Sequence, residues 1–491
     1  MKHTHYLLIS VLLLMGCSQP SSEIPASAEV QKIDRYLQEV VARHHIPGLT
    51  VAATRNDTVV YSRAFGFRNI DKQEPMKTNN IFHWASVSKT FVGMAILQLA
   101  EKGKINLDEK LITYLPYFKQ KDKAYKDITI RTILNHTSGI SDVEDYEWEH
   151  PQNDDGAPER YVRGLANDAM LFEPGTDFSY SNTAYEILGV VIATVSGMSF
   201  EEYIRQNILI PLKMNQTSFI YPEIPDSLRV SGHIWNGRPQ VSKVYPYNRI
   251  HAPSSTLNSN VLEMTHYAMA NLNRGVFNDV RILSDSSYHT MWTNSIHLAD
   301  KPTIGVSWFT DKHRGMTTIM HSGGDTGFRS FLLLVPEKNI SVAVVCNYEL
   351  GYTSDMALGV LDLLVGQEPD LVRLPIGFAF AEKMLAEGLD SAKGFYQKTG
   401  KDTVQRKYYS WPDNGFTHAA YLLFNAEKLP EAIELLKFNL ELNPNSAPGN
   451  GHLGIGYAKS GNKEQARRYL QRALEIDATN SYFKEELQKL N

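Results

Sequence analysis

Cysteine, basic charge and metal-binding motifs are all scarce in this 491-residue chain. It has two cysteines, and its 49 Lys and Arg residues are outnumbered by 54 Asp and Glu residues, for a formal net charge of −5. This balance gives no electrostatic footprint for nucleic acid, so we expect no nucleic-acid partner. No His-Glu-x-x-His motif and no closely spaced cysteine pair occurs. The sequence therefore predicts no catalytic metal and no other cofactor.

Long hydrophobic runs are also missing, and the N-terminal run is short. It covers Tyr6 to Met15, follows Lys2, and is too short to span a bilayer, which is typical of an export signal. It ends in Leu14-Met15-Gly16-Cys17, which resembles a bacterial lipobox. We therefore predict a lipoprotein signal peptide over residues 1–17, lipidation of Cys17, and a Ser/Pro-rich tether over residues 18–29. An ordinary signal peptide with a chance cysteine is the alternative.

The predicted location follows from this N-terminus. The protein would be exported and lipid-anchored to a bacterial membrane, on its periplasmic or outer face. If Cys17 is acylated, the second cysteine, Cys346, has no partner for an intramolecular disulfide. Cys346 lies in the apolar run Ile340 to Cys346, where we expect a small buried side chain.

The most informative motif is Ser86-Val87-Ser88-Lys89, at the start of an apolar, helix-like run from Trp84 to Ala100. Helix positions i and i+3 share a face, so the Ser86 hydroxyl and the Lys89 amine can meet. Serine needs an adjacent base to become a nucleophile, and a desolvated lysine can be that base. The pattern alone is weak, because it recurs at Ser460 to Lys463 and Ser481 to Lys484.

Two further motifs strengthen the first copy. Tyr180-Ser181-Asn182 and then His321-Ser322-Gly323-Gly324 follow it along the chain. This order resembles the penicillin-recognising serine hydrolases, which include class C β-lactamases, serine DD-peptidases, D-aminopeptidases and lactamase-like esterases. The similarity extends over about residues 30–368. Other segments that carry it are Phe82 to Thr90, Leu134 to Gly139, Pro174 to Asn182, Ile210 to Met214, Gly327 to Phe331 and Pro336 to Lys338.

The resemblance implies an α+β fold: an antiparallel sheet flanked by helices, with a large helical insert. The residues fit this layout, since two strand-like runs, 49–54 and 58–64, are joined at Asn56-Asp57 as in a hairpin. Signals from Ser86 to Leu262 are mainly helical. Strand-like runs return at 303–310, 317–321, 330–335 and 340–346.

The resemblance also implies a role for each motif residue. Ser86 would be the nucleophile, and Lys89 and Tyr180 would share the proton transfers. Asn182 would orient Lys89 and contact the substrate, together with His321, Ser322 and Gly323 on a strand at the edge of the pocket. The backbone N–H groups of Ser86 and Gly324 would form the oxyanion hole. The alternatives are ordinary structural roles: a helix N-cap for Ser86, a core tyrosine for Tyr180 and a turn-capping asparagine for Asn182.

Two histidines bear on specificity. Most class C β-lactamases have lysine where this chain has His321, and a neutral imidazole would bind a substrate carboxylate less well unless a neighbouring acid kept it charged. We therefore expect weak or absent β-lactamase activity. His136, in Leu134 to Gly139, is interpreted as a structural residue in a loop near the site.

The C-terminal region has a different pattern. Ala432 and Ala466, and likewise Leu436 and Leu470, are separated by 34 residues, the period of tetratricopeptide repeats. We predict a helical linker over residues 369–411 and, over residues 412–491, two repeats with a capping helix.

The leading hypothesis is a lipid-anchored serine hydrolase that acts through an acyl-enzyme on an amide or ester. A cell-wall D-amino-acid peptidase and a small-molecule esterase rank close together, and a β-lactamase third. The substrate would be a small molecule or peptide, possibly derived from the cell wall. The alternative class is a non-catalytic scaffold, which would use the repeats to bind peptidoglycan, a peptide or a partner protein.

Overall fold

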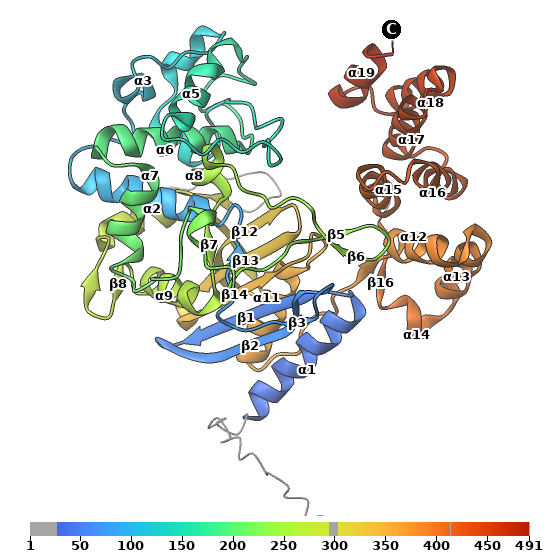
Figure 1. Ribbon diagram of the computed structural model, residues 1–491, viewed down its shortest axis with the longest axis horizontal. Helices are drawn as coiled ribbons and strands as arrows, with labels where there is room; N and C mark the ends of the chain where they lie inside the picture. Colours follow the sequence, from blue (N-terminus) through green and yellow to red (C-terminus); the bar gives the residue numbers. More distant parts are fainter. Residues whose placement is uncertain (1–26, 294–302, 413, 491) are drawn as a thin grey trace, which may run out of the picture.

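The computed structural model describes residues 27–293, 303–412 and 414–490. The predicted signal peptide, the lipidation site Cys17 and most of the expected tether lie outside the described residues. Within them, the fold is built on one antiparallel sheet whose strands come from both ends of the predicted hydrolase region (Figure 1). In spatial order its eight strands are β10 (Thr303–Ile304), β11 (Phe309–His313), β12 (Met316–Asp325), β13 (Phe328–Val335), β14 (Ile340–Cys346), β1 (Gly48–Arg55), β2 (Thr58–Asn69) and β3 (Glu74–Pro75).

The sheet matches the sequence-based strands with one correction. Asn56 and Asp57 have φ values of 49° and 58°, which makes the tight β1–β2 turn that the hairpin signal predicts. The run 303–310, expected to be one strand, is divided between β10 and β11. Ser307 interrupts it, with φ of 62°, and its N–H bonds to the carbonyl of Leu134 in the helical insert. A tertiary contact therefore overrides the local strand propensity.

One face of the sheet is covered by the helical insert. Its apolar core joins inward-facing strand residues such as Ala52 and Leu332 to the helices. The central helix α2 is buried along nearly its whole length, and α9 packs directly on β1 and β14. The helices of the insert are α2 (Ser88–Glu101), α3 (Leu111–Tyr114), α4 (Ile130–Leu134), α5 (Ala157–Gly164), α6 (Asn182–Ser196), α7 (Phe200–Ile204), α8 (Ala252–Ser255), α9 (Val261–Leu272) and α10 (Asp285–Thr293).

Short strands and single turns complete the insert and the loops. The strands are β4 (Phe82–His83), β5 (His233–Trp235), β6 (Pro239–Val241), β7 (Asn258–Ser259), β8 (Val276–Phe277) and β9 (Val280–Arg281). The turns are η1 (Lys123–Asp127), η2 (Leu165–Asn167), η3 (Arg205–Leu209), η4 (Tyr221–Glu223), η5 (Arg249–His251) and η6 (Pro336–Lys338).

The opposite face of the sheet is covered by α1 (Ala28–Arg43) and α11 (Thr353–Leu364), which pack on each other. Helix α1 begins within the expected tether, with Ser27 as its N-cap. Side chains that alternate with those of the insert face, such as Val51 and Val344, join this second core.

The C-terminal region is helical as expected, and it is not separate from the hydrolase region. Residues of α12 and α15 belong to the same apolar core as α1 and α11. Two helix pairs and a last helix fill the span of the predicted repeats, but a tetratricopeptide architecture stays a prediction, as do the domain boundaries. The elements are β15 (Leu374–Pro375), α12 (Ile376–Glu387), α13 (Leu389–Lys401), α14 (Thr403–Arg406), β16 (Tyr409–Ser410), α15 (Gly415–Asn425), α16 (Leu429–Leu442), α17 (Ala447–Lys459), α18 (Lys463–Ile476) and α19 (Ser481–Gln488).

The β5–β6 hairpin joins the two regions. The Trp235 ring is 1% exposed and lies edge-on to Phe378 of α12, with ring centroids 5.2 Å apart. Its indole N–H donates to Glu382 over 3.1 Å. A buried aromatic with its polar atom paired fixes one orientation, so the predicted linker is a packed part of the body.

In the described residues, no single helix has the length and apolar character needed to cross a membrane. One bent pair, Asn182–Ser196 with Phe200–Leu209, passes that test by length and composition.

Candidate active site

The turn before α2 places Ser86 at a helix N-terminus. Ala85, just before it, has a left-handed φ of 47°, and the Trp84 N–H bonds to the Leu257 carbonyl over 2.7 Å. The Ser88 hydroxyl ties the turn further, since it donates to the Ala85 carbonyl over 2.6 Å and accepts the Leu257 N–H over 2.9 Å. The half-buried Ser86 side chain is thus presented on a firmly held turn.

Lys89 is buried directly below Ser86. Its Nζ atom lies 3.1 Å from the Ser86 hydroxyl, 2.5 Å from Asn182 Oδ1 and 2.8 Å from the Ser254 carbonyl oxygen. The Asn182 and Ser254 oxygens are acceptors only, so they engage two N–H bonds of the amine. In the neutral form the remaining lone pair therefore points to Ser86.

The electrostatics of Lys89 favour that neutral form more than those of an ordinary lysine. Burial lowers the pKa of Lys89 to about 8, against the opposing charges of Glu186, Asp142 and Asp325. A lysine with that pKa is neutral in an appreciable fraction of molecules near neutral pH.

Tyr180 lies beside this pair. Lys89 Nζ is 5.0 Å from the centroid of its ring, and burial holds the pKa of Tyr180 well above its usual range, although an interaction with Ser86 opposes the shift. The phenol is therefore protonated in the resting site and can donate a proton. On its other side the ring stacks on His136 at 4.2 Å.

His136 holds the segment that carries Tyr180. It is fully buried, and its Nδ1 accepts the Ser181 N–H over 3.1 Å. Burial, followed by the charge of Lys89, lowers the pKa of His136 well below its usual value, so the imidazole is neutral. The geometry supports the interpretation of His136 as a structural residue near the site.

Strand β12 forms the other wall of the site. Its neighbour β11 pairs with it only as far as Met320, so among the described strands none covers its outer edge from His321 to Asp325. An ideal Cβ on Gly323 would lie 2.2 Å from the Trp84 carbonyl oxygen. Only glycine at this position lets β12 approach the Ser86 turn so closely.

The same close approach brings Gly324 next to the Ser86 turn. Within the described residues, the Ser86 N–H has no acceptor, as expected for an N–H at the start of a helix. The structure thus brings Ser86 and the Gly323–Gly324 segment together, and the oxyanion-hole role stays a prediction. The Ser322 side chain is exposed and points to the opposite face of the strand from His321.

His321 faces Lys89 and carries no charge. Its Nδ1–H donates to the Ser322 carbonyl over 2.7 Å. Burial, together with the nearby charge of Lys89, lowers the pKa of His321 to about 3. Arg329 pairs with Gly324 across β12 and β13, so its side chain leaves the strand pair on the opposite face from His321.

Comparison with known proteins agrees with this geometry. The model of the Beta-lactamase family matches residues 33–367. The chain belongs to the β-lactamase family. Protein flp of Staphylococcus aureus (strain N315) is 28% identical over 324 residues, which cover 66% of this chain and 64% of that protein. The chain therefore spans less than two thirds of that relative's length. Penicillin-binding protein 4* of Bacillus subtilis (strain 168) is 35% identical over 180 residues, 36% of this chain and 38% of that protein.

Solved structures show the same β-lactamase-family fold. The octameric penicillin-binding protein homologue from Pyrococcus abyssi superposes with a TM-score of 0.62 and 29% identity, over 70% of this chain and 78% of that one. The D-amino acid amidase from Ochrobactrum anthropi SV3, solved with D-phenylalanine, superposes with a TM-score of 0.59 and 20% identity, over 69% of this chain and 99% of that one. At that identity the second likeness concerns the fold alone.

Three polar residues of this β-lactamase-family site were not found from the sequence: Asp142, Glu186 and Ser254. Asp142 accepts the Asn182 side-chain N–H over 3.0 Å and thereby orients the amide that holds Lys89. Its place after the Leu134 to Gly139 segment was a signal, as was the position of Glu186 one turn after Asn182 on the same helix face. Nothing in the sequence marked Ser254.

Glu186 is the buried member of this set. It is 1% exposed, and Oε1 accepts from His251 Nδ1 at 3.0 Å and from the Ser254 hydroxyl at 2.5 Å. Burial raises the pKa of Glu186. Because the Ser254 carbonyl receives Lys89 Nζ, Glu186 fixes one of the acceptors that position the lysine.

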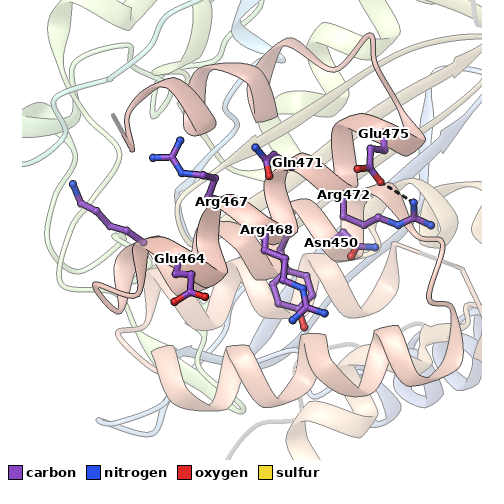
Figure 2. A pocket seen from close by; sticks show the side chains of 9 residues that line it. Asn450, Glu464, Arg467, Arg468, Gln471, Arg472 and Glu475 are labelled. Atoms are coloured by element: carbon purple, nitrogen blue, oxygen red, sulfur yellow. Dashed lines mark hydrogen bonds and ion pairs between the residues drawn. The ribbon is translucent and has the colours of Figure 1, made fainter.

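A cavity of about 720 Å³ lies on the C-terminal helices (Figure 2). Helix α18 provides most of its lining, and Arg472 of that helix pairs with Glu475 over 2.9 Å. The charged lining residues are Lys463, Glu464, Arg467, Arg468, Arg472 and Glu475. Basic groups therefore outnumber acidic ones on this surface.

Proposed function

We propose that the protein is a serine hydrolase that cleaves an amide or ester through an acyl-enzyme on Ser86. The observation that carries the proposal is the position of Lys89 Nζ, held by two carbonyl-type acceptors and 3.1 Å from the Ser86 hydroxyl. Family membership and the solved relatives support the same chemistry.

In the acylation step, Ser86 Oγ forms a bond to the substrate carbonyl carbon and its proton passes to the neutral Lys89 amine. The carbonyl oxygen takes up the negative charge and is stabilised by the N–H groups of Ser86 and Gly324. Tyr180 then donates its proton to the leaving nitrogen or oxygen as the bond to carbon breaks. Protonated Lys89 restores the Tyr180 proton, so the enzyme ends the step acylated and with neutral lysine.

Deacylation repeats the sequence with water. Water gives its proton to Lys89 and bonds to the acyl carbon, and Ser86 Oγ leaves and recovers a proton from the same amine. The raised pKa of Tyr180 and the lowered pKa of Lys89 both favour the lysine as the proton acceptor.

The neutral His321 supports a substrate without a carboxylate beside the scissile bond. A D-amino-acid amide or peptide, or an ester, fits this site better than a β-lactam. The D-amino acid amidase solved with D-phenylalanine has the same fold, so this fold can accommodate the cleavage of an amide.

In the test, the protein is exposed to a fluorophosphonate and, separately, to a penicillin, and its intact mass is then measured. The Ser86→Ala variant is the test case. Ser460→Ala is the matched control, because Ser460 belongs to another Ser-x-x-Lys pattern and is exposed on the C-terminal helices. One fluorophosphonate adduct on wild type and on Ser460→Ala, and none on Ser86→Ala, is the expected result. The proposal would be contradicted if folded wild type formed no adduct, or if Ser86→Ala formed the same adduct as wild type.

Export and lipidation at Cys17 are a separate part of the proposal, supported by the lipobox-like sequence. Metabolic labelling with an alkyne fatty acid in the native cell is the test. We expect the wild-type protein to be labelled and Cys17→Ala to remain unlabelled. Equal labelling of both proteins, or of neither, would contradict lipidation at Cys17.

The basic cavity of α18 favours a second candidate function, in which the C-terminal helices bind an acidic segment of a partner protein. Binding of a fluorescent poly-glutamate peptide to Ser86→Ala protein tests this. A rise in peptide anisotropy with the Ser86→Ala protein, and a smaller rise when Arg468→Gln/Arg472→Gln are added to it, supports this function. The absence of binding at low salt would rule it out.

A further inference from the structure

A second cavity, of about 330 Å³, lies in the helical insert and has an acidic wall. Its lining includes Asp145, Glu147, Arg160 and His251. Both acidic side chains are exposed on the loop that precedes α5, whereas His251 is a buried residue of the lining.

The one guanidinium of this cavity is already neutralised. Arg160 donates to both carboxylate oxygens of Asp154 at 2.7 Å and to Gln152 at 3.1 Å. Such a bidentate pair engages most of the donors of the fork. Asp145 and Glu147 therefore give the cavity a net negative charge.

His251 supplies a fixed acceptor that is independent of the two acids. It is 2% exposed, and its ring lies edge-on to those of Tyr146 and Trp148, with centroids 4.9 Å and 5.5 Å away. Nδ1 lies 3.0 Å from the buried Glu186 carboxylate, which can only accept, so Nδ1–H is the donor of this bond. In the neutral imidazole Nε2 is then a lone-pair acceptor. Among the described residues Nε2 has no partner, and the ring lines the cavity.

A short path of hydrogen bonds and backbone connects the cavity to Lys89. Asp142 bonds to Asn182, which in turn holds Lys89, and Asp145 follows only three residues later. Three residues of extended chain span at most about 11 Å. Tyr146, between the two acids, is near enough to Tyr180 for that phenol to contribute to the raised pKa of Tyr146, after burial and three carboxylates.

The acceptor groups of this cavity favour an organic cation as its ligand. No group of three His, Cys, Asp or Glu side chains in the described part of the chain is arranged to hold a metal ion. The volume accommodates several heavy atoms, and an ammonium has three N–H donors for acceptors on different walls.

We propose that this cavity binds a primary alkylammonium of the substrate, carried one or two residues from the scissile carbonyl. The inference rests on the proposed function, since it names the substrate class of the Ser86 site. The Asp145 and Glu147 carboxylates provide the attraction, and the His251 Nε2 lone pair provides a directional acceptor.

The experiment compares two fluorophosphonate series that react with Ser86. One carries an ω-aminoalkyl chain of about four to ten carbons, the range needed to bridge the estimated span. The other carries the same chains with the amine acetylated. The second-order rate of Ser86 labelling is measured for wild type, for Asp145→Asn/Glu147→Gln, and for Glu149→Gln, an exposed acid on the same loop that does not line the cavity.

We expect the amine to be labelled about tenfold faster than its acetylated partner at the best chain length, in wild type and in Glu149→Gln. The ratio falls toward one in Asp145→Asn/Glu147→Gln, and in wild type it falls with added salt because the acids are exposed. A ratio near one at every length, with Ser86 still labelled, would overturn the inference and leave the proposed function standing. A ratio insensitive to both salt and the double variant would overturn it as well. Loss of all labelling in wild type would instead count against the proposed function.

Discussion

Gly323 of β12 and the Trp84 carbonyl are in such close contact that an added Cβ would lie 2.2 Å from the oxygen. The Ser330 hydroxyl donates to the same carbonyl over 2.7 Å, so the carbonyl is held in place from two sides. This contact sets the distance between the Ser86 turn and β12, and it explains why the third residue of the His321 motif is glycine.

The first prediction concerns this contact. Gly323→Ala pushes β12 away from Ser86, so we expect labelling and turnover to fall by about 100-fold or more, the typical size of losing an oxyanion-hole donor. Thermal unfolding reports the accompanying strain. Gly164→Ala is the control, since nothing lies within 4 Å of its Cβ position. Wild-type activity in Gly323→Ala would show that the close approach is not needed.

The second prediction concerns Glu186. Its charge raises the pKa of Lys89, so Glu186→Gln lowers that pKa further. The acidic limb of the pH–rate profile for Ser86 labelling should then move to lower pH, while the amide retains an acceptor for Ser254. Glu202→Gln removes an exposed acid paired with Arg205 and serves as the control with an unmoved profile. A limb that stays in place, or moves to higher pH, would show that Glu186 does not act on Lys89.

The Glu186 network also shows where sequence reasoning stops. Ser86 and Lys89 are predictable because they are three residues apart on one helix face, and Tyr180 and Asn182 because the order of the motifs resembles a known family. The structure brings all four together. Ser254 was not predictable, since it acts through its backbone carbonyl, which every residue has. Its role exists only because α8 packs against α2 and α6.

The secondary structure shows the same difference between features specified by neighbouring residues and features that depend on distant contacts. Asn56 and Asp57 predicted the β1–β2 hairpin because the turn is specified by its own residues. The break at Ser307 was missed because it depends on the Leu134 carbonyl, far away in the sequence. The packing of α12 on Trp235 was missed for the same reason, since helical periodicity identifies an apolar face without naming its partner.

The third prediction concerns acid stability. The folded state depresses the pKa of His321 to about 3, whereas an unfolded histidine titrates near 6.5. Between these values the unfolded chain binds the extra proton, so folding stability falls as the pH drops below about 6.5, by at most about 1.4 kcal/mol per pH unit from this group. Urea unfolding at several pH values measures the slope, and His321→Asn should reduce it. The exposed His150 provides the control variant, His150→Asn, which should leave the slope unchanged. An equal slope in wild type and His321→Asn would contradict a neutral, buried His321.

The central claim is that the neutral Lys89 amine takes the proton from Ser86. The most direct test is the pH dependence of the rate at which a fluorophosphonate labels Ser86, in wild type and in Lys89→Arg. We predict a wild-type rate that rises with pH through an inflection near 8, the pKa to which burial lowers this lysine. Lys89→Arg, which stays charged, should react at least about 100-fold more slowly at every pH. A pH-independent wild-type rate, or a folded Lys89→Arg protein that is labelled as fast as wild type, would contradict the account.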